Sequence, residues 1–323
     1  MDGLVPPPRF GTTTFGAYTP IDPSQELARD RVAAFAATAG APAGGSRFAF
    51  RWRRRGEGHG LYLDGGFGVG KTHLLAAAWH ASPLPASMKR YLSFQELVYL
   101  LGVLGRDGAR EAFAGVKLVC LDEFELDDPG NTLLIATFLR EAFARGTSVI
   151  TTSNTPPEAQ GAGRFAAKDF QREIQAIADR FEVVTIDGPD HRAGVGRADW
   201  CPPAELAQAA EQVTGVVRAA SYGELLRTLE RYHPTRYREL LHHVDLLIVE
   251  RMRPIADQNA ALRFVHFIDK LYDLGTAFRA SGLAPLNETF DPSYRDGAYL
   301  TKHHRCLSRL SELLDEPLAP RTG

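Results

Sequence analysis

The chain has 323 residues, of which 44% are apolar and 24% are charged, as in ordinary globular proteins of one large domain or two smaller ones. Its formal net charge of −2 excludes the strong basic field of dedicated nucleic-acid binders, so we expect no nucleic-acid partner. No apolar run approaches the roughly 18–20 residues of a membrane span, and the first residues lack the pattern of a secretory signal. Three widely spaced cysteines fit a reducing compartment, and we expect a cytoplasmic protein.

Residues 1–58 predict an extended segment, one capped helix and a basic strand. The opening residues are rich in Pro, Gly and Thr, and Asp22 can cap a helix that has Pro23 at its first position. Arginine occupies four of the five positions from Arg51 to Arg55. We interpret this run as a solvated edge strand, where charge discourages aggregation. The alternative is a patch that binds phosphate or an acidic partner.

Residues 59–190 alternate between the patterns of strands and helices. Strands are predicted at the short apolar runs 61–64, 90–93, 116–124, 148–154 and 182–186. Helices are predicted at the longer stretches between them, 71–81, 94–102, 131–146 and 170–181. Strands that alternate with helices in this way form a parallel sheet covered on both faces. The sequence therefore predicts an α/β fold.

The segment "GGFGVGKT" fits the pattern G-x-x-x-x-G-K-[ST] of a phosphate-binding loop. It stands between a predicted strand and a predicted helix, which is the context that this loop requires. Its glycines let backbone N–H groups face phosphate oxygens, and the helix that follows adds the positive end of its dipole. Lys71 would reach the β- and γ-phosphates, and the Thr72 hydroxyl would ligate Mg²⁺. The other expected nucleotide contacts are Gly65, Gly66, Phe67, Gly68, Val69 and Gly70.

Two acids follow the strand in "LVCLDEF". Four apolar residues place Asp122 at the carboxyl end of a buried strand, which is the edge where open parallel sheets bind ligands. Asp122 can hold Mg²⁺ through water, and Glu123 can polarise the water that attacks the γ-phosphate. A glutamate directly after the aspartate favours an enzyme that hydrolyses its nucleotide.

A polar residue, Asn154, ends the next strand, and it can bond the γ-phosphate or the attacking water. The order of loop, acidic strand end and polar strand end resembles the AAA+ ATPases, in which Asn154 would be the first sensor. Such enzymes commonly complete their site with an arginine from a neighbouring subunit, which implies self-association. Arg164 and Arg172 are the candidates and Arg180 is an outsider. Each of them can instead be a solvated helix residue.

Residues 191–205 are rich in Pro and Gly and predict a loop, and residues 206–323 predict a mixed α/β region that is mostly helical. A shift of 129 positions brings Gly275 onto Gly146 and Asp257 onto Asp128. We interpret residues 245–285 as a second strand–helix–strand unit that echoes the first, with chance similarity as the alternative. Arg251 and Met252 then replace the two acids, so this unit cannot repeat their chemistry.

Four segments resemble the ZapE/AFG-type AAA+ ATPases: "LVCLDEFELDD", "LREAFARGTSVITTSNTPPE", "LRFVHFIDKLYDLG" and "HRCLSRLSELL". The resemblance implies ATP as the nucleotide, a P-loop fold of the AAA+ type in residues 59–190, and a C-terminal region that completes the ATPase module. It also implies a protein partner, in bacteria the FtsZ division machinery. By the same resemblance Arg309 could act as a second sensor, and the alternative is a helix residue that packs inside the C-terminal region. The family's arginine before the last loop glycine is Val69 here.

The sequence thus favours a Mg²⁺-dependent ATPase that remodels or regulates a protein partner in cell division. One alternative is an accessory ATPase for nucleic acids, similar to the helicase loaders, for which the Arg51–Arg55 run is the support. The other is a nucleotide-gated scaffold with little turnover, against which the Asp122–Glu123 pair argues.

Overall fold

The computed structural model describes residues 4–40, 57–126, 128–160, 167–189, 197–294 and 300–318, with backbone only for 167–171 and 301. The fold divides into two compact units. The first comprises Met1–Pro6 and Phe10–His191, and the second comprises Pro7–Arg9 and Arg192–Gly323. Within the described residues, no helix combines the length and the apolar character that crossing a membrane requires.

The first unit is built on a five-stranded parallel sheet with the strand order β2-β3-β4-β1-β5. Its strands are β1 (Gly60–Gly65), β2 (Lys89–Ser93), β3 (Leu118–Asp122), β4 (Ser148–Ser153) and β5 (Phe181–Ile186). Its helices are α1 (Pro23–Thr38), α2 (Lys71–Ala81), α3 (Phe94–Ala112), α4 (Pro129–Ala144) and α5 (Ala167–Ala178). The predicted α/β fold is confirmed, and α2 has the bounds that the sequence predicted.

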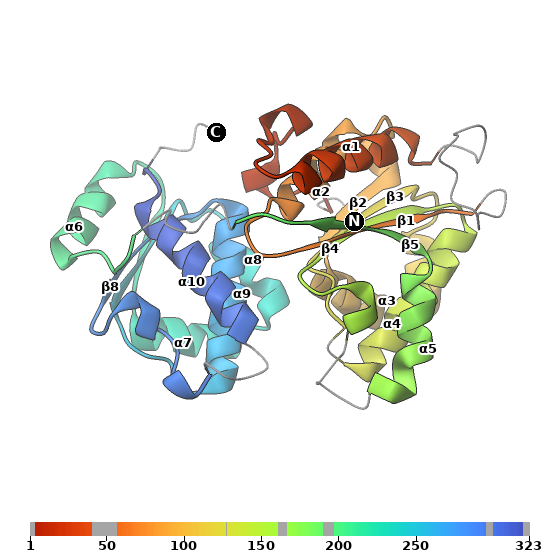
Figure 1. Ribbon diagram of the computed structural model, residues 1–323. Helices are drawn as coiled ribbons and strands as arrows, with labels where there is room; N and C mark the ends of the chain where they lie inside the picture. The colour runs from red at the N-terminus through yellow and green to blue at the C-terminus, as the bar shows by residue number, and fades with distance from the viewer. Residues whose placement is uncertain are drawn as a thin grey trace. The chain divides into compact units, whose positions relative to one another are not determined.

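Helices cover both faces of this sheet. Figure 1 shows α1 and α2 on one face and α3, α4 and α5 on the other. Alternate residues of a strand point to opposite faces, so Val119 and Leu121 of β3 pack toward α3–α5 while Leu118 and Cys120 pack toward α1 and α2. β3 is therefore apolar on both sides as far as Asp122, at its carboxyl end.

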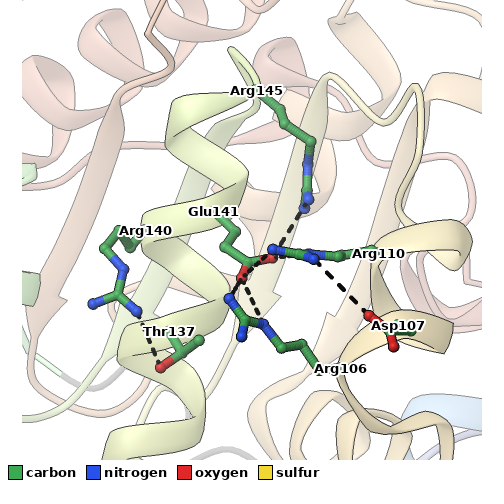
Figure 2. A network of polar contacts seen from close by, with 7 residues as sticks. All are labelled: Arg106, Asp107, Arg110, Thr137, Arg140, Glu141 and Arg145. Carbon is green, nitrogen blue, oxygen red and sulfur yellow. Dashed lines mark hydrogen bonds and ion pairs between the residues drawn. The ribbon is translucent and has the colours of Figure 1, made fainter.

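A cluster of charged side chains fastens α3 to α4 (Figure 2). The φ of 62° at Gly105 interrupts α3, and the turn that follows carries Arg106 and Arg110. Both guanidinium groups donate to the carboxylate of Glu141 on α4, over distances of 2.9–3.2 Å. Arg145 contacts the same carboxylate at 3.7 Å. Hydrogen bonds from Arg110 and Arg106 lower the pKa of Glu141 to about 2.

The second unit contains a three-stranded parallel sheet with the order β6-β7-β8. Its strands are β6 (Val217–Ser221), β7 (Leu246–Met252) and β8 (Ala277–Gly282). Its helices are α6 (Pro203–Gln212), α7 (Tyr222–Arg231), α8 (Tyr237–Leu241), α9 (Gln258–Leu274) and α10 (Leu300–Asp315). α9 packs against α7 and α10, while α6 packs on β7 and β8. The predicted second strand–helix–strand unit is confirmed as β7–α9–β8.

The second unit repeats part of the first unit in detail. β2 of the first unit and β6 of the second each lead into a helix that starts with a complete capping box, made by Ser93 and Glu96 in one and by Ser221 and Glu224 in the other. α4 of the first unit begins after the cap Asp128, and α9 of the second unit begins after the cap Asp257. A short 3₁₀ turn follows β4 at Pro157–Ala159 and follows β8 at Leu286–Glu288. Matching local structures at matching places argue against chance similarity.

The register of the strands corrects one of our alignments. β4 and β8 lie 129 positions apart, from 148 to 277, whereas β3 and β7 lie 128 apart, from 118 to 246. The caps of α4 and α9, Asp128 and Asp257, also lie 129 apart, so the second unit has one extra residue between its strand and its helix. The residues that match Asp122 and Glu123 are Glu250 and Arg251, rather than Arg251 and Met252.

Three predicted segments near the domain boundaries differ from the structure or lie outside its described residues. The Arg51–Arg55 run lies outside the described residues. α1 contributes to the same apolar core as α2 and β1, so the N-terminal helix belongs to the first unit. α6 begins at Pro203, inside the segment 191–205 that we expected to be a loop, because Pro203 and Glu205 suit the first turn of a helix.

We expect Glu141→Gln to lower the free energy of unfolding by about 1 kcal/mol at neutral pH, since partly exposed ion pairs contribute modestly. The pKa of Glu141 is depressed in the folded state, so its contribution is present above the ordinary pKa of a glutamate and is lost as the pH falls toward about 2. Urea unfolding at pH 7 and pH 3 measures the difference. Glu230→Gln, at an exposed position of α7, is the control, and an equal effect of both variants would contradict the prediction.

Candidate functional site

Three strand ends of the first unit lie side by side. β1 pairs with β4, which brings Asp64 beside Ser153, and β4 pairs with β3, which brings Thr151 beside Leu121. All three strands are parallel, so their carboxyl ends meet at one edge of the sheet. The phosphate-binding loop follows β1, the acids end β3, and Asn154 follows β4. The sheet therefore assembles the three motifs that the sequence predicted.

The loop between β1 and α2 is closely packed by its surroundings. Gly70 has a φ of 89°, and a Cβ there would lie 2.4 Å from the ring of Tyr18. The Tyr18 hydroxyl donates to the carbonyl of Val69 over 2.7 Å. A Cβ on Gly65 would lie 2.3 Å from the carbonyl oxygen of Ile186. Glycine is required at both positions, and Tyr18 holds the loop from outside the motif.

Lys71 and Asn154 contact each other directly. The Lys71 amine donates to the Asn154 side-chain oxygen over 2.9 Å and to the carbonyl of Gly65 over 2.8 Å, and it also bonds the carbonyl of Gly66. α2 begins at Lys71, so the N–H groups of its first turn face the same region. The structure brings together a lysine and an asparagine that the sequence assigned to separate motifs, and the sensor role of Asn154 stays a prediction.

The Asp122 carboxylate collects hydroxyl groups from three elements. One of its oxygens, Oδ1, accepts from Thr72 over 3.3 Å and from Thr152, and the other, Oδ2, accepts from the Tyr91 hydroxyl over 3.4 Å. A carboxylate and a hydroxyl this close are oxygen ligands of the kind that Mg²⁺ prefers. The donor set at Thr72 and Asp122 therefore fits a magnesium ion that is bound by the protein and by phosphate.

Glu123 follows Asp122 in a strained backbone conformation. Its φ is 57°, a left-handed value that is uncommon for a residue other than glycine. The Glu123 N–H donates to the Thr152 hydroxyl over 3.0 Å and to Asp122 Oδ1 over 3.2 Å. Glu123 is half-buried. Strain of this kind is typical of functional sites.

A buried acid adds negative charge next to the loop. Asp64 is the next-to-last residue of β1 and is 7% exposed. Burial raises the pKa of Asp64, and the nearby Lys71 opposes that rise in part. The loop lysine thus interacts with the buried carboxyl group of Asp64.

The structure describes two of the three candidate arginines, and these two lie in different surroundings. Arg164 lies outside the described residues. Arg172 is exposed on α5, as a residue that acts on a neighbouring subunit would have to be. Arg180 follows α5 and donates to Glu57 over 3.1 Å. The choice of an arginine that completes the site in another copy stays a prediction.

Arg309 is buried inside the second unit, on α10. It is 5% exposed, forms an ion pair with Asp269 of α9, and its guanidinium lies 5.1 Å from the ring centroid of Tyr272. Arg305 donates to the same carboxylate over 2.7 Å. Burial by itself would raise the pKa of Asp269, but Arg305 and Arg309 outweigh it and hold that pKa below its ordinary value. This buried ion pair gives Arg309 a structural role, and its role as a second sensor stays a prediction.

Comparison with known proteins agrees with this geometry. The model of the AFG1-like ATPase family matches residues 17–212 and 204–321. The chain belongs to the AFG1-like ATPase family. The resemblance that the sequence motifs indicated is thereby confirmed, together with the P-loop and the ATP-binding character that the family name implies.

The similarity to two relatives extends over most of this chain and most of each relative. Cell division protein ZapE of Escherichia coli (strain K12) is 26% identical over 306 residues, which cover 81% of this chain and 80% of that protein. An uncharacterized protein of Schizosaccharomyces pombe is 24% identical over 326 residues, which cover 79% of this chain and 72% of that protein. Among solved structures, the DnaC helicase loader aligns with 56% of this chain and 99% of its own at 21% identity, and its TM-score of 0.40 is too low to bear on function.

Sequence reasoning missed three residues of the site: Tyr18, Tyr91 and Thr152. No motif marks either tyrosine, because each reaches the site from an element that the sequence does not connect with it. Thr152 could have been found from the run "TTSN", in which three hydroxyl residues at the end of a buried strand stand directly before Asn154.

We expect Asp269→Asn to destabilise the protein by about 3–5 kcal/mol, because two buried guanidinium groups would lose their shared carboxylate. Thermal unfolding measures this loss. A double-mutant cycle with Arg309→Ala should show strong coupling, since the two residues are in contact.

Arg305→Ala is the matched control for the second-sensor role of Arg309, because it removes the other partner of Asp269. A purely structural Arg309 predicts equal losses of stability and unchanged ATP affinity for Arg305→Ala and Arg309→Ala. A selective loss of ATP affinity in Arg309→Ala would contradict the structural role and support the sensor.

Proposed function

We propose that this chain hydrolyses ATP in the presence of Mg²⁺ and uses the cycle to remodel or regulate a protein partner. The observation that carries the proposal is the contact of side chains across three strand ends, from Lys71 to Asn154 and from Thr72 to Asp122. These are the groups that phosphoryl transfer uses for positioning and for charge neutralisation. Membership of the AFG1-like ATPase family supports the same activity.

Each side chain has a proposed role. The loop backbone and Lys71 bind the β- and γ-phosphates, while Thr72 and Asp122 hold the metal. Mg²⁺, when bound, neutralises charge on the phosphate oxygens. Glu123 accepts a proton from the attacking water, and Asn154 orients that water against the γ-phosphate. The hydrogen bond between Asn154 and Lys71 supports this placement of Asn154 at the phosphate end of the site.

The partner is proposed from similarity to ZapE, which is named as a cell division protein. We propose a protein of the division machinery in the cytoplasm, with FtsZ as the first candidate. Purified FtsZ should raise the ATPase rate, and single-stranded DNA at the same ionic strength should leave it unchanged. Stimulation by DNA alone, with a steep dependence on salt, would favour an accessory role on nucleic acid instead.

We expect Glu123→Gln to bind ATP normally and to hydrolyse it about 10²–10⁴-fold more slowly, because the general base is lost while the phosphate contacts remain. Lys71→Ala should weaken nucleotide binding itself. Steady-state phosphate release gives the rates, and fluorescence of a labelled nucleotide gives the affinity. A wild type that binds ATP but is no faster than Glu123→Gln, with FtsZ or without it, would refute hydrolysis and leave a nucleotide-gated binder.

We expect the wild-type turnover number to rise with protein concentration, because an arginine supplied by a neighbouring copy requires self-association. Arg172→Ala or Arg164→Ala should abolish that rise, and Arg140→Ala, at an exposed position of α4, should preserve it. Sedimentation on the same samples reports the assembly. A turnover number that stays constant from dilute monomer to high concentration would contradict a trans-acting arginine.

A further inference from the structure

A run of three hydroxyl residues on β4 binds the segment that leaves β3. Thr151 donates to the carbonyl of Leu121 over 2.8 Å, and Ser153 donates to the carbonyl of Phe124 over 2.8 Å. Between them, Thr152 is 2% exposed, donates to Asp122 Oδ1 and accepts the N–H of Glu123. The backbone is tied at the same place, since the Phe124 N–H donates to the Thr152 carbonyl over 2.8 Å. Every residue from the end of β3 to Phe124 is thus held by β4.

Thr152 differs from its two neighbours in what it holds. Thr151 and Ser153 bond only main-chain carbonyls in this segment, whereas the Thr152 hydroxyl bonds the carboxylate of one acid and the N–H of the other. A hydroxyl has one proton to donate and can accept another, so both bonds can exist together. We propose that Thr152 is a positioning residue for hydrolysis: its hydroxyl fixes the left-handed turn at Glu123 and the orientation of Asp122 at once.

The second unit supplies independent evidence for the backbone part of this role. Arg251 corresponds to Glu123 and has a φ of 58°, and its N–H donates to the hydroxyl of Ser281 over 3.0 Å. The residues that correspond to Thr151, Thr152 and Ser153 are Ala280, Ser281 and Gly282. Only the hydroxyl at the position of Thr152 is present in both units. It accompanies the left-handed residue even where that residue is an arginine and no pair of acids follows the strand.

A comparison of the two units distinguishes the structural role of this hydroxyl from its proposed role in the reaction. In the second unit the hydroxyl holds the turn, and in the first unit the same turn carries the proposed general base. Thr152 therefore acts on the reaction through Glu123 and Asp122. A loss of its hydroxyl should slow the chemical step and weaken the metal's contribution, while the phosphate contacts of the loop at Lys71 stay intact.

This inference rests on the proposed ATP hydrolysis, and the test uses the full chain. We expect Thr152→Val, which keeps the side-chain volume, to lower kcat about 10- to 100-fold, as small displacements of catalytic groups do, with KM for ATP within about threefold of wild type. The Mg²⁺ concentration for half-maximal rate should rise. Thr152→Ser keeps the hydroxyl and should restore kcat to within about threefold. In a Glu123→Gln background, Thr152→Val should add little, because both changes affect the same step.

Ser281→Ala is the matched control, since it removes the corresponding hydroxyl from the second unit. It should lower the melting temperature without changing kcat or the Mg²⁺ requirement. A readout independent of turnover is the ratio of ADP affinities measured with and without Mg²⁺, which should fall in Thr152→Val and stay constant in Ser281→Ala. If Thr152→Val does not fold, Thr152→Ala serves in its place.

Three outcomes would overturn the inference. They are a Thr152→Val variant with wild-type kcat and Mg²⁺ requirement, a Thr152→Ser variant as impaired as Thr152→Val, and a Ser281→Ala variant with the same loss of kcat. The second outcome would show that side-chain volume matters and that the hydroxyl does not. A wild type without turnover would refute the proposed function instead, and the Mg²⁺-dependent ADP affinity would then still decide the role of Thr152.

Discussion

The parallel register of β1, β3 and β4 is the constraint on which the candidate site depends. Because these strands run in one direction and pair without a bulge, the residues that follow them meet at the same edge of the sheet. Lys71 of α2 therefore contacts Asn154, which follows β4. Thr72, beside Lys71, contacts Asp122 at the end of β3. A shift of one residue in any of these pairs would turn the side chains to the other face and separate the motifs.

The second unit has the same arrangement of strands and helices without the pair of acids. It has the same succession of strand, capped helix, strand, helix and strand, and the same left-handed residue after its middle strand. It has no counterpart of the phosphate loop among its described strands, and Glu250 and Arg251 occupy the places of the two acids. The shared arrangement of strands supplies positions, and the proposed activity depends on a few side chains at the strand ends of the first unit.

The sequence predicted those parts of the molecule that depend on neighbours in the chain. α2 has the predicted bounds because glycines, lysine and an alanine-rich stretch determine a loop and a helix locally. The positions of Asp122 and Asn154 at strand ends were predicted correctly because a polar residue at the end of an apolar run marks a strand end. Tyr18, Tyr91 and the pair of Asp269 with Arg309 were not found in these roles, because each depends on a contact between elements far apart in the sequence. The extra residue after β7 was missed for a related reason, since only the strand register reveals it.

That extra residue bears on how the two units differ. The path from the left-handed residue to the cap of the next helix is longer by one position in the second unit, which leads from Arg251 to Asp257, than in the first, which leads from Glu123 to Asp128. Both paths start from an N–H that is held by a hydroxyl of the last strand. The anchor is thus common to the two units, and the segment beyond it is free to vary in length. The left-handed turn is thus held in the same way whether a glutamate or an arginine occupies it.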